Sequence, residues 1–560
     1  MICKVKLPHS VQEVVVESTV RWALLRDAGY EVSADLSVEE CNRLAEKEGF
    51  VGAQVDGQIV ELDFHITGDC TVAPLTIDDY FGRHIVMRSA STLLMYIARQ
   101  VAPQVSLEVG QSLHSQLFFN VQGAEDPVRL GELLNKRFKE MVKGQVPFMM
   151  RMVPPSVALR RISDPDGDRR VLVHCWVGER FGLVRLGDYY ELAHGPFVPT
   201  TGFLESIKVV GLPEGLLLAC EPVKLPSPEF KSFMLGAAKQ AKDWNKRMGI
   251  ETVGKLNEMI LRGEGQNLVQ VSETFHELRI GEIASQILER PQVKVVFISG
   301  PSSSGKTSTV RRHSTHFQAM GKQTCYVGLD DYYLAREFCP VDENGEHDFE
   351  SLQALNVERI KSDLASLVEG RKTAVPRFDF PNQRPFPPED ERIMQIGEDQ
   401  ILLVEGIHGL NPELTKAISP ERRFTLFVSS MPQLALDANN RVPTTYARLL
   451  RRIIRDRRYR GTTASSTIRR WPSVRRGENK YIFPYQSLAD AMFNSALAYE
   501  LAVFRTFAWP YLLEVLPNDP AYAMARDMLR FLSMVVPMDT EWVPKNSVLR
   551  EFLGGSIYQY

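Results

Sequence analysis

The stretch VKVVFISGPSSSGKTSTVRR, residues 293–312, decides the fold of the C-terminal half of the chain. It opens with a short, β-branched apolar run, which is typical of a strand buried on both faces of a sheet. A glycine-flanked loop follows and fits the pattern G-x-x-x-x-G-K-[ST] at Gly300, Gly305, Lys306 and Thr307. A helix is expected from about Lys306. This order of strand, loop and helix predicts a site for the phosphates of a nucleoside triphosphate.

The spacing of this loop has a physical reason. Glycines permit the backbone conformations and the close approach that let N–H groups surround phosphate oxygens, and the helix adds its positive N-terminal end. Lys306 would reach the β- and γ-phosphates, and the Thr307 hydroxyl would bind Mg²⁺. The residues expected to hold the triphosphate are Gly300, Pro301, Ser302, Ser303, Ser304, Gly305, Lys306, Thr307 and Ser308. The alternative is a Gly/Ser turn that joins a strand to a helix.

Length and composition set the limits for the whole chain. A chain of 560 residues exceeds what one core spans, so we expect about three or four domains. A net charge of −3 argues against a protein that coats nucleic acid non-specifically. No apolar run reaches the roughly 18 residues of a membrane span, and the start MICKVKLPHS lacks a signal core. The seven cysteines are scattered without a C-x-x-C pair, which favours a reduced, cytoplasmic protein without membrane contact.

Residues 1–78 and 79–211 are expected to form two small modules of mixed α and β structure. The first has strand-like runs such as KVKL and EVVVEST, a helical segment near residues 39–48, and a hairpin in VGAQVDGQIVELD. Through AQVDGQIVELD it resembles the β-grasp-like TGS domain of threonyl-tRNA synthetases. The second resembles the editing domain of those synthetases, through RSASTLLMYIARQV and GDYYELAHGPFVPTTGFLESIKVV.

The second module departs from that family where its chemistry lies. Two helical histidines of the family correspond to Arg88 and Thr92, and the downstream Cys and His to Ala193 and Phe197. We therefore predict neither editing activity nor a zinc ion there. The nearby His84, His174 and His194 are interpreted as surface or core residues. The remaining shell could bind RNA or a small molecule, or serve as a scaffold. Residues 212–290 are expected to be a linker at 222–228 followed by a helical connector.

Two acidic residues follow strands that come after the phosphate loop. The strand QTCYVGL, residues 323–329, leads into DDYYLAR, so Asp330 or Asp331 would lie at the carboxyl edge of the sheet. There it would accept the proton of an attacking hydroxyl, the alternative being a helix N-cap. The strand in QILLVEGIHGLN ends at Glu405, which is predicted to hold Mg²⁺ opposite Thr307 unless it merely caps a helix.

Two further segments carry candidate site residues. The rings of VPRFDFPNQRPFPP could stack on a planar base that Asp379 or Arg384 orients, the alternative being a surface loop. The run RLLRRIIRDRRYRG, residues 448–461, predicts a helix with an apolar stripe and arginines on its other faces. We interpret it as a catalytic lid that neutralises transferring phosphate, against a solvated basic face or an RNA-binding helix.

The end of the chain is expected to be mostly helical. We predict one long helix within residues 471–508, a last strand at LLEVLP, a helix in DPAYAMARDMLRFLSMVV, and a C-terminal tail over 541–560.

Residues 291–540 resemble the uridine kinase branch of the uridine kinase and phosphoribulokinase family. The likeness rests on GPSSSGKTS, LDDYY, DFESLQAL, PRFDF, LLVEGI, RLLRRIIRD and LADAMFNSAL. It implies an α/β fold with a mainly parallel sheet and ATP-dependent phosphorylation of a nucleoside hydroxyl. It makes Asp330 the general base and Arg452, Arg455 and Arg460 the lid arginines, while a further lid arginine is Thr462 here. It places the acceptor near Tyr332, Tyr333, Phe349, Glu350, Phe378 and Gln383, and Arg384 is added to this set as the candidate that orients the base.

Several of these residues differ from the family pattern, which leaves the acceptor open. Glu350 replaces an aspartate that holds the ribose, Phe378 replaces a tyrosine, and Gln383 replaces a histidine that reads the base. We expect a Mg²⁺- and ATP-dependent kinase of a uridine- or cytidine-like nucleoside or similar small molecule. The alternatives are a kinase of an amino acid or sugar, and an RNA-associated regulatory protein switched by nucleotide. An oligomer is compatible with the sequence.

Overall fold

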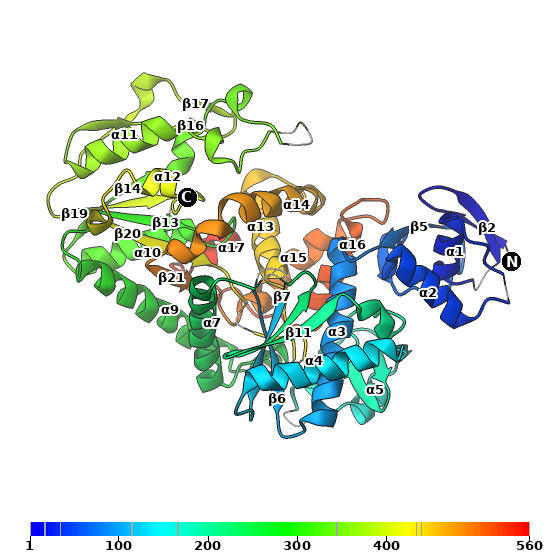
Figure 1. Ribbon diagram of the computed structural model, residues 1–560. Coiled ribbons are helices and arrows are strands. Elements are labelled where there is room, and N and C mark those ends of the chain that lie inside the picture. The colour runs from blue at the N-terminus through cyan, green and yellow to red at the C-terminus, as the bar shows by residue number, and fades with distance from the viewer. Residues whose placement is uncertain are drawn as a thin grey trace.

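The computed structural model describes residues 2–15, 18–33, 35–113, 116–164, 167–223, 225–342, 345, 347–432, 434–437 and 439–558 (Figure 1). Residues 16 and 17 of the expected strand EVVVEST, and residue 224 of the expected linker, lie outside these ranges.

The first module is a five-stranded sheet in the order β2-β1-β5-β3-β4 with two helices packed on it. Its elements are β1 Ile2–Lys6, β2 Val11–Val15, α1 Val20–Asp27, α2 Val38–Glu48, β3 Gly52–Val55, β4 Gln58–Val60 and β5 Cys70–Leu75. The predicted helix near 39–48 is confirmed as α2, because Ser37 and Glu40 form a capping box at its start and Gly49 ends it in a left-handed conformation. The predicted hairpin is β3–β4.

The second module packs a long helix against two antiparallel sheets, in the orders β11-β12-β7-β6 and β10-β9-β8. Its elements are α3 Tyr80–Val101, β6 Ser106–Leu113, β7 Gln116–Gln122, α4 Pro127–Lys143, β8 Met149–Val153, α5 Pro155–Arg161, α6 Asp168–Cys175, β9 Phe181–Leu186, β10 Tyr189–Leu192, β11 Ile207–Leu212 and β12 Gly215–Cys220. Because β12 pairs with both β11 and β7, we propose that this module extends beyond residue 211 to Cys220.

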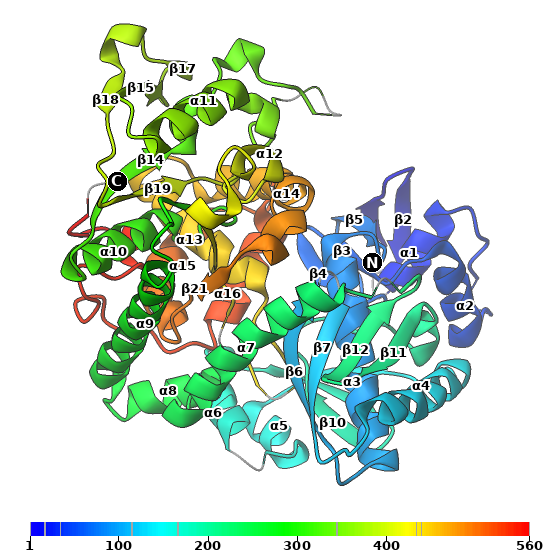
Figure 2. The same cartoon turned by 60° about the vertical axis from the view of Figure 1, so that its left-hand side comes forward.

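The connector is helical, with α7 Pro228–Met248, α8 Val253–Leu261 and α9 Gly265–Leu288. Helix α7 lies between the second module and the C-terminal domain (Figure 2). Phe230 packs into the cluster around Leu113 and Phe118, while the Phe233 ring lies 6.5 Å from that of Phe427. The connector is therefore packed on both of its neighbours.

The C-terminal domain contains a five-stranded sheet in the order β14-β19-β13-β20-β21, and every pairing in it is parallel. Its strands are β13 Val295–Ser299, β14 Gln323–Gly328, β19 Gln400–Glu405, β20 Arg423–Ser429 and β21 Ala491–Asn494. Short strands outside it are β15 Thr373–Val375, β16 Phe378–Asp379, β17 Arg384–Pro385 and β18 Arg392–Met394. Its helices are α10 Lys306–Ala319, α11 Val357–Val368, α12 Pro412–Thr415, α13 Thr444–Arg460, α14 Ala464–Tyr481, α15 Glu500–Leu513, α16 Tyr522–Leu532 and α17 Arg550–Leu553.

Helices cover both faces of this sheet. Val295 and Phe297 of β13 join a core with α11 and α12, whereas Val296 and Ile298 join a core with α9 and α10. Figure 1 shows these two pairs of helices on opposite sides of the sheet. The prediction of a mainly parallel α/β domain with β13 buried on both faces is confirmed.

Two predictions for the end of the chain are wrong. The expected long helix within 471–508 is divided into the end of α14, strand β21 and the start of α15, because β21 adds to the edge of the parallel sheet. LLEVLP is not a strand, since α15 runs to Leu513. The predicted helix in DPAYAMARDMLRFLSMVV is confirmed as α16.

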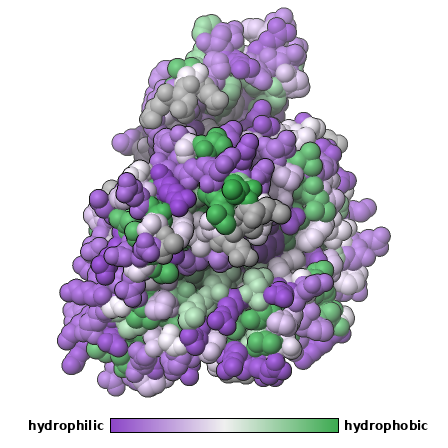
Figure 3. All heavy atoms as spheres, turned by 90° about the vertical axis from the view of Figure 1, so that its right-hand side faces the viewer, coloured by the Kyte–Doolittle hydropathy of each residue, from purple (hydrophilic) through white to green (hydrophobic). Residues whose placement is uncertain are grey.

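The second module and the C-terminal domain share one hydrophobic core. A single cluster of buried side chains joins Leu172 and Phe181 to Leu449, Ile453 and Phe504. The first module contacts α16, where Gly57 lies against Tyr522. The face in Figure 3 is largely hydrophilic, with hydrophobic residues in scattered patches. Within the described ranges, no helix combines the length and apolarity needed to cross a bilayer.

Candidate functional site

The phosphate loop connects β13 to α10 in a conformation that requires its two glycines. Gly305 has a left-handed φ of 80°, and a Cβ there would lie 2.5 Å from Val548 Cγ2. A Cβ on Gly300 would lie 2.0 Å from the carbonyl oxygen of Val428 on β20. Ser303 also has a positive φ, of 58°. The glycines therefore allow the loop to curl closely over the carboxyl end of the sheet.

Polar groups of this loop have capacity to bind a ligand. The hydroxyls of Ser303 and Ser304 are buried and have no hydrogen-bond partner within the described part of the chain. The Lys306 Nζ donates to the carbonyl oxygen of Pro301 at 3.2 Å. Buried hydroxyls without partners are costly unless a ligand or water satisfies them. The loop thus fits the phosphates of a nucleoside triphosphate.

Glu405 ends strand β19 beside the phosphate loop. It accepts hydrogen bonds from Thr307 Oγ1 at 3.3 Å and from the Tyr326 hydroxyl at 3.2 Å. Burial raises the pKa of Glu405 to about 7 against the attraction of Lys306, and the negative charge of Asp330 adds to the rise. A hydroxyl and a carboxylate are oxygen ligands of the kind Mg²⁺ takes together with phosphates and waters. No cluster of three or more His, Cys, Asp or Glu side chains that could hold a metal ion is found among the described residues.

Asp330 lies in the 3₁₀ turn Leu329–Tyr332 directly after β14. Desolvation by the surrounding protein atoms raises the pKa of its carboxyl, while Lys306, Arg460 and Arg455 act in the opposite direction. These three cations therefore surround Asp330. Asp330 itself is exposed at the carboxyl edge of the sheet, where an acceptor can reach it. A carboxylate with a raised pKa is the type of group that accepts a proton near neutral pH.

The arginines of α13 divide into two sets. Arg452 donates to the Ser302 hydroxyl at 2.8 Å, and Asp456 pairs with Arg452, Arg455 and Arg460. Repulsion from Arg455 lowers the pKa of Arg460, and burial with repulsion from Arg455 lowers that of Arg452. The three guanidinium groups share Asp456 as their salt-bridge partner and repel one another, so this set favours an anion.

The other set is structural. Arg448 and Arg451, expected on the polar faces of the helix, are buried. Arg448 pairs with the buried Glu478 of α14 and donates to the Ser302 carbonyl at 2.9 Å. Arg451 pairs with Glu500 at 2.5 Å. They fix α13 to the loop and to α15. No local pattern indicates these two partners, because Glu478 and Glu500 both lie in the segment 471–508, for which the sequence predicts a single helix.

Glu350 and two aromatic rings lie on the acceptor side of the site. Burial and the charge of Glu478 raise the pKa of Glu350 to about 7, with Arg452 and Lys306 opposing. The Tyr333 ring is 5.6 Å from Phe378, and its hydroxyl donates to the Phe349 carbonyl at 2.8 Å. Together these residues provide an acidic group beside apolar ring faces.

Three predicted acceptor contacts receive no support from their positions. Tyr332 packs in the core under the sheet, and its hydroxyl donates to Asp363 of α11 at 3.1 Å. Gln383 and Arg384 are exposed at the β16–β17 turn, where the Gln383 amide oxygen accepts from Arg336 at 3.3 Å. Neighbours at a 3₁₀ turn point in different directions, which is why Tyr333 faces the site and Tyr332 does not.

The positions of the missing editing residues lie together in the second module. Arg88 donates to the Pro196 carbonyl at 2.8 Å, and Ala193 and Phe197 are buried. The neighbouring His194 lies 3.1 Å from Asp437, which belongs to the segment between β20 and α13. A segment of the C-terminal domain therefore packs where the resemblance would place the editing chemistry.

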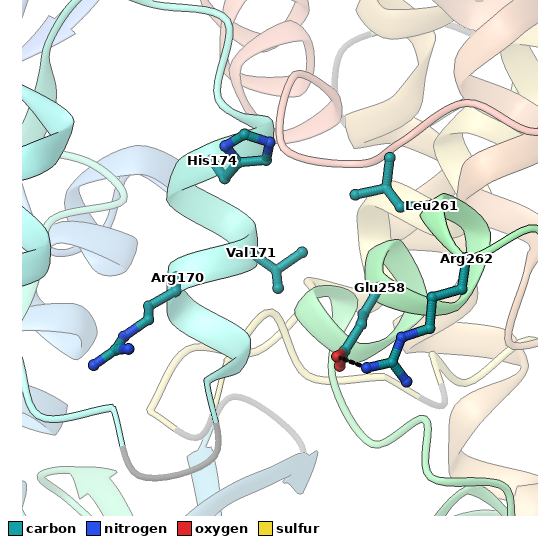
Figure 4. A pocket seen from close by; sticks show the side chains of 6 residues that line it. All are labelled: Arg170, Val171, His174, Glu258, Leu261 and Arg262. Atoms are coloured by element: carbon teal, nitrogen blue, oxygen red, sulfur yellow. Dashed lines mark hydrogen bonds and ion pairs between the residues drawn. The ribbon is translucent and has the colours of Figure 1, made fainter.

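A separate pocket of about 300 Å³ opens between α6 and α8 (Figure 4). Its lining residues are Arg170, Val171, His174, Glu258, Leu261 and Arg262. Glu258 pairs with Arg262 at 2.5 Å across one turn of α8. None of the residues discussed around the phosphate loop lines this pocket.

Fold and geometry define a P-loop α/β domain, and the comparisons with known proteins assign its family. Residues 295–501 match the model of the Phosphoribulokinase / Uridine kinase family. The C-terminal part of the chain is therefore a domain of this family. Among solved structures, a possible uridine kinase from Bacillus stearothermophilus is 16% identical with a TM-score of 0.25, covering 36% of this chain and 89% of that one. D-glycerate 3-kinase from Cryptococcus neoformans is 12% identical with a TM-score of 0.23, covering 45% and 87%.

The N-terminal part matches threonine–tRNA ligases. The Clostridium kluyveri ligase is 27% identical over 165 residues, or 29% of this chain and 26% of the ligase. The Desulfosudis oleivorans ligase is 26% identical over 159 residues, or 28% and 25%. The chain thus spans about a quarter of the length of these relatives.

Proposed function

We propose that this protein is an ATP- and Mg²⁺-dependent kinase that transfers the γ-phosphoryl group to a hydroxyl of a nucleoside or similar small molecule. The observation that carries the proposal is the convergence of Lys306, Asp330, Glu405 and the arginines of α13 on one phosphate loop. The family match of residues 295–501 supports it. The test is ATP consumption by the full chain with nucleosides, sugars and amino acids in turn. No turnover with any hydroxyl acceptor would count against the proposal.

The side chains divide the work of transfer. The phosphate loop and Lys306 would hold the triphosphate, and Thr307 and Glu405 would hold Mg²⁺, which would neutralise phosphate charge. Asp330 accepts the proton of the acceptor hydroxyl, since its raised pKa suits a general base. Arg452, Arg455 and Arg460 stabilise the negative charge on the transferring group. Catalysis of this type depends on positioning and charge stabilisation.

The acceptor is held, in this proposal, by Glu350 and by the rings of Tyr333, Phe349 and Phe378. A carboxylate accepts hydrogen bonds from sugar hydroxyls, and the rings suit a planar base. A nucleoside fits both features, and its absence from the accepted substrates would favour the sugar or amino acid alternatives.

The RNA-associated alternative receives less support. The segment around Asp437 packs beside His194, where the editing chemistry of the synthetase family would lie. We therefore propose that the second module acts as a scaffold for the kinase domain. Salt-sensitive retention of tRNA by the full chain would favour the alternative instead.

Glu350→Gln is expected to lower kcat/KM for the phosphate-accepting substrate by about 10- to 100-fold at pH 8. The reason is that a hydrogen bond from a substrate hydroxyl to the charged carboxylate is lost. KM for ATP should stay unchanged. The raised pKa of Glu350, about 7, means that the carboxylate predominates above pH 7 and the neutral acid below it. The gap between wild type and variant should therefore shrink as pH falls below 7, and steady-state kinetics at several pH values measures this.

The exposed Glu389→Gln provides the control, since it changes the same group on the surface. It should leave both constants unchanged. A gap between wild type and Glu350→Gln that stays constant from pH 6 to pH 8 would contradict the assigned role.

A further inference from the structure

A carboxylate from the last helix of the chain contacts the phosphate-binding end of α10. Glu551 of α17 accepts hydrogen bonds from the Ser308 backbone N–H at 3.2 Å and from the Ser308 hydroxyl at 2.7 Å. Ser308 belongs to the first turn of α10, whose backbone N–H groups have no partner within the helix. In a phosphate loop these groups face phosphate oxygens. Glu551 thus makes contacts that a bound phosphate would make.

The helix that carries Glu551 is firmly packed. Val548, Leu549 and Phe552 are fully buried in the core shared with α13 and α15. The Arg451 guanidinium lies 5.2 Å from the centre of the Phe552 ring. Val548 is the side chain that a Cβ on Gly305 would meet. The expected C-terminal tail is therefore part of the wall of the site, and it holds the Glu551 carboxylate against the loop.

Glu551 differs in its ion pairs from Glu478, the other carboxylate that contacts the loop. Within the described residues, no lysine or arginine forms a salt bridge with Glu551. By contrast, Glu478, which accepts from the Ser302 backbone N–H at 3.1 Å, is paired with Arg448 and Arg475. Two arginines therefore neutralise the charge of Glu478, and its contact with the loop is structural. Glu551 brings a negative charge, which no salt bridge of the described residues offsets, to a place suited to phosphate.

We propose that Glu551 determines nucleotide affinity by competing with phosphate for Ser308. Nucleotide binding requires the carboxylate to leave these two donors, and the repulsion between carboxylate and phosphate opposes binding. The inference rests on the proposed function, because it takes the loop to be the nucleotide site. It gives the last helix of the chain control over how tightly that site binds.

The test is calorimetric titration of the full chain with MgADP and with adenosine. Glu551→Gln keeps an oxygen that accepts from Ser308 but removes the charge, and Glu551→Ala removes both. Both variants are expected to bind MgADP about tenfold more tightly than wild type, because juxtaposed like charges are costly. Adenosine, which has no phosphate, should bind equally to all three proteins. Glu541→Gln changes a glutamate that precedes the same helix and should behave as wild type.

The outcomes separate the inference from the proposed function. If wild type binds MgADP and both variants bind it equally or more weakly, the inference is overturned while the nucleotide site stands. If adenosine binding tightens as much as MgADP binding, the effect does not arise from phosphate and the inference is again rejected. If none of the proteins binds MgADP, the nucleotide site itself is rejected, and the inference with it.

Discussion

Replacing Lys306 by alanine is expected to lower kcat by about a thousandfold or more, because the variant loses the cation that we propose to contact the transferring phosphate. Within the described residues, the Lys306 Nζ donates to the Pro301 carbonyl and forms no salt bridge, so it is available to a ligand. Initial rates of ATP consumption with the best acceptor from the substrate screen measure the loss.

The loss should exceed that of one hydrogen bond, since Lys306 also acts on the carboxylates around it. Its charge opposes the rise in the pKa of Asp330, Glu350 and Glu405. Without it, each pKa moves further upward, and a larger fraction of the general base is protonated at neutral pH. The residual activity of Lys306→Ala should therefore recover partly as pH rises.

Lys322→Ala is the matched control. Lys322 forms a surface ion pair with Asp399 at 3.0 Å, and pairs of this kind contribute little to stability. Its kcat should equal that of wild type. Undiminished turnover by Lys306→Ala would reject the assignment of the phosphate loop as the site of transfer.

Local sequence patterns predicted the parts of the site that depend on neighbouring residues. The unbroken apolar run of β13, the glycines of the loop, the acidic residue after β14 and the one that ends β19 are all set within short segments. The carboxyl ends of parallel strands meet at one edge, so Asp330 and Glu405 could be predicted to lie near Lys306.

The contacts that the sequence did not predict join segments far apart in the chain. Glu551 reaches Ser308 across 243 residues, and Glu478 reaches Arg448 across 30 residues on another helix. Both depend on how α14 and α17 pack, and short patterns carry no information about that. The orientation of Tyr332 was missed for a related reason, because the 3₁₀ turn after β14 decides which of two adjacent tyrosines is buried.

A single substitution should affect stability most at the contact between the second module and the C-terminal domain. Asp437 is fully buried between them. It lies 3.1 Å from His194 Nε2 and 3.8 Å from the Arg169 guanidinium, and it accepts the Asn439 and Asn440 backbone N–H groups at 2.9 Å each. Arg169 is also paired with the buried Glu191 at 3.2 Å. These contacts fix the segment that leads into α13.

Asp437→Ala is expected to lower the free energy of unfolding by about 3 kcal/mol, because it leaves two backbone donors and the His194 ring without this partner and leaves Arg169 with Glu191 as its counterion. Urea unfolding followed by tryptophan fluorescence measures the change. Asp399→Ala, which removes an exposed aspartate, should cost no more than about 1 kcal/mol. Equal unfolding midpoints for these two variants would show that the Asp437 contacts do not hold the modules together.

The pH dependence of this effect has a definite sign. Burial alone would raise the pKa of Asp437, but the attraction of Arg169 and the hydrogen bonds from His194 and Asn440 outweigh it and hold the pKa well below its usual range. A carboxyl with a depressed pKa stabilises the folded state above its unfolded pKa of about 4, and this stabilisation is lost as pH falls toward the folded value. The stability difference between wild type and Asp437→Ala should therefore stay constant from about pH 5 to pH 8 and shrink only in stronger acid. A difference that already disappears at pH 5 would mean that the charge on Asp437 does not hold the second module against the segment that leads into α13.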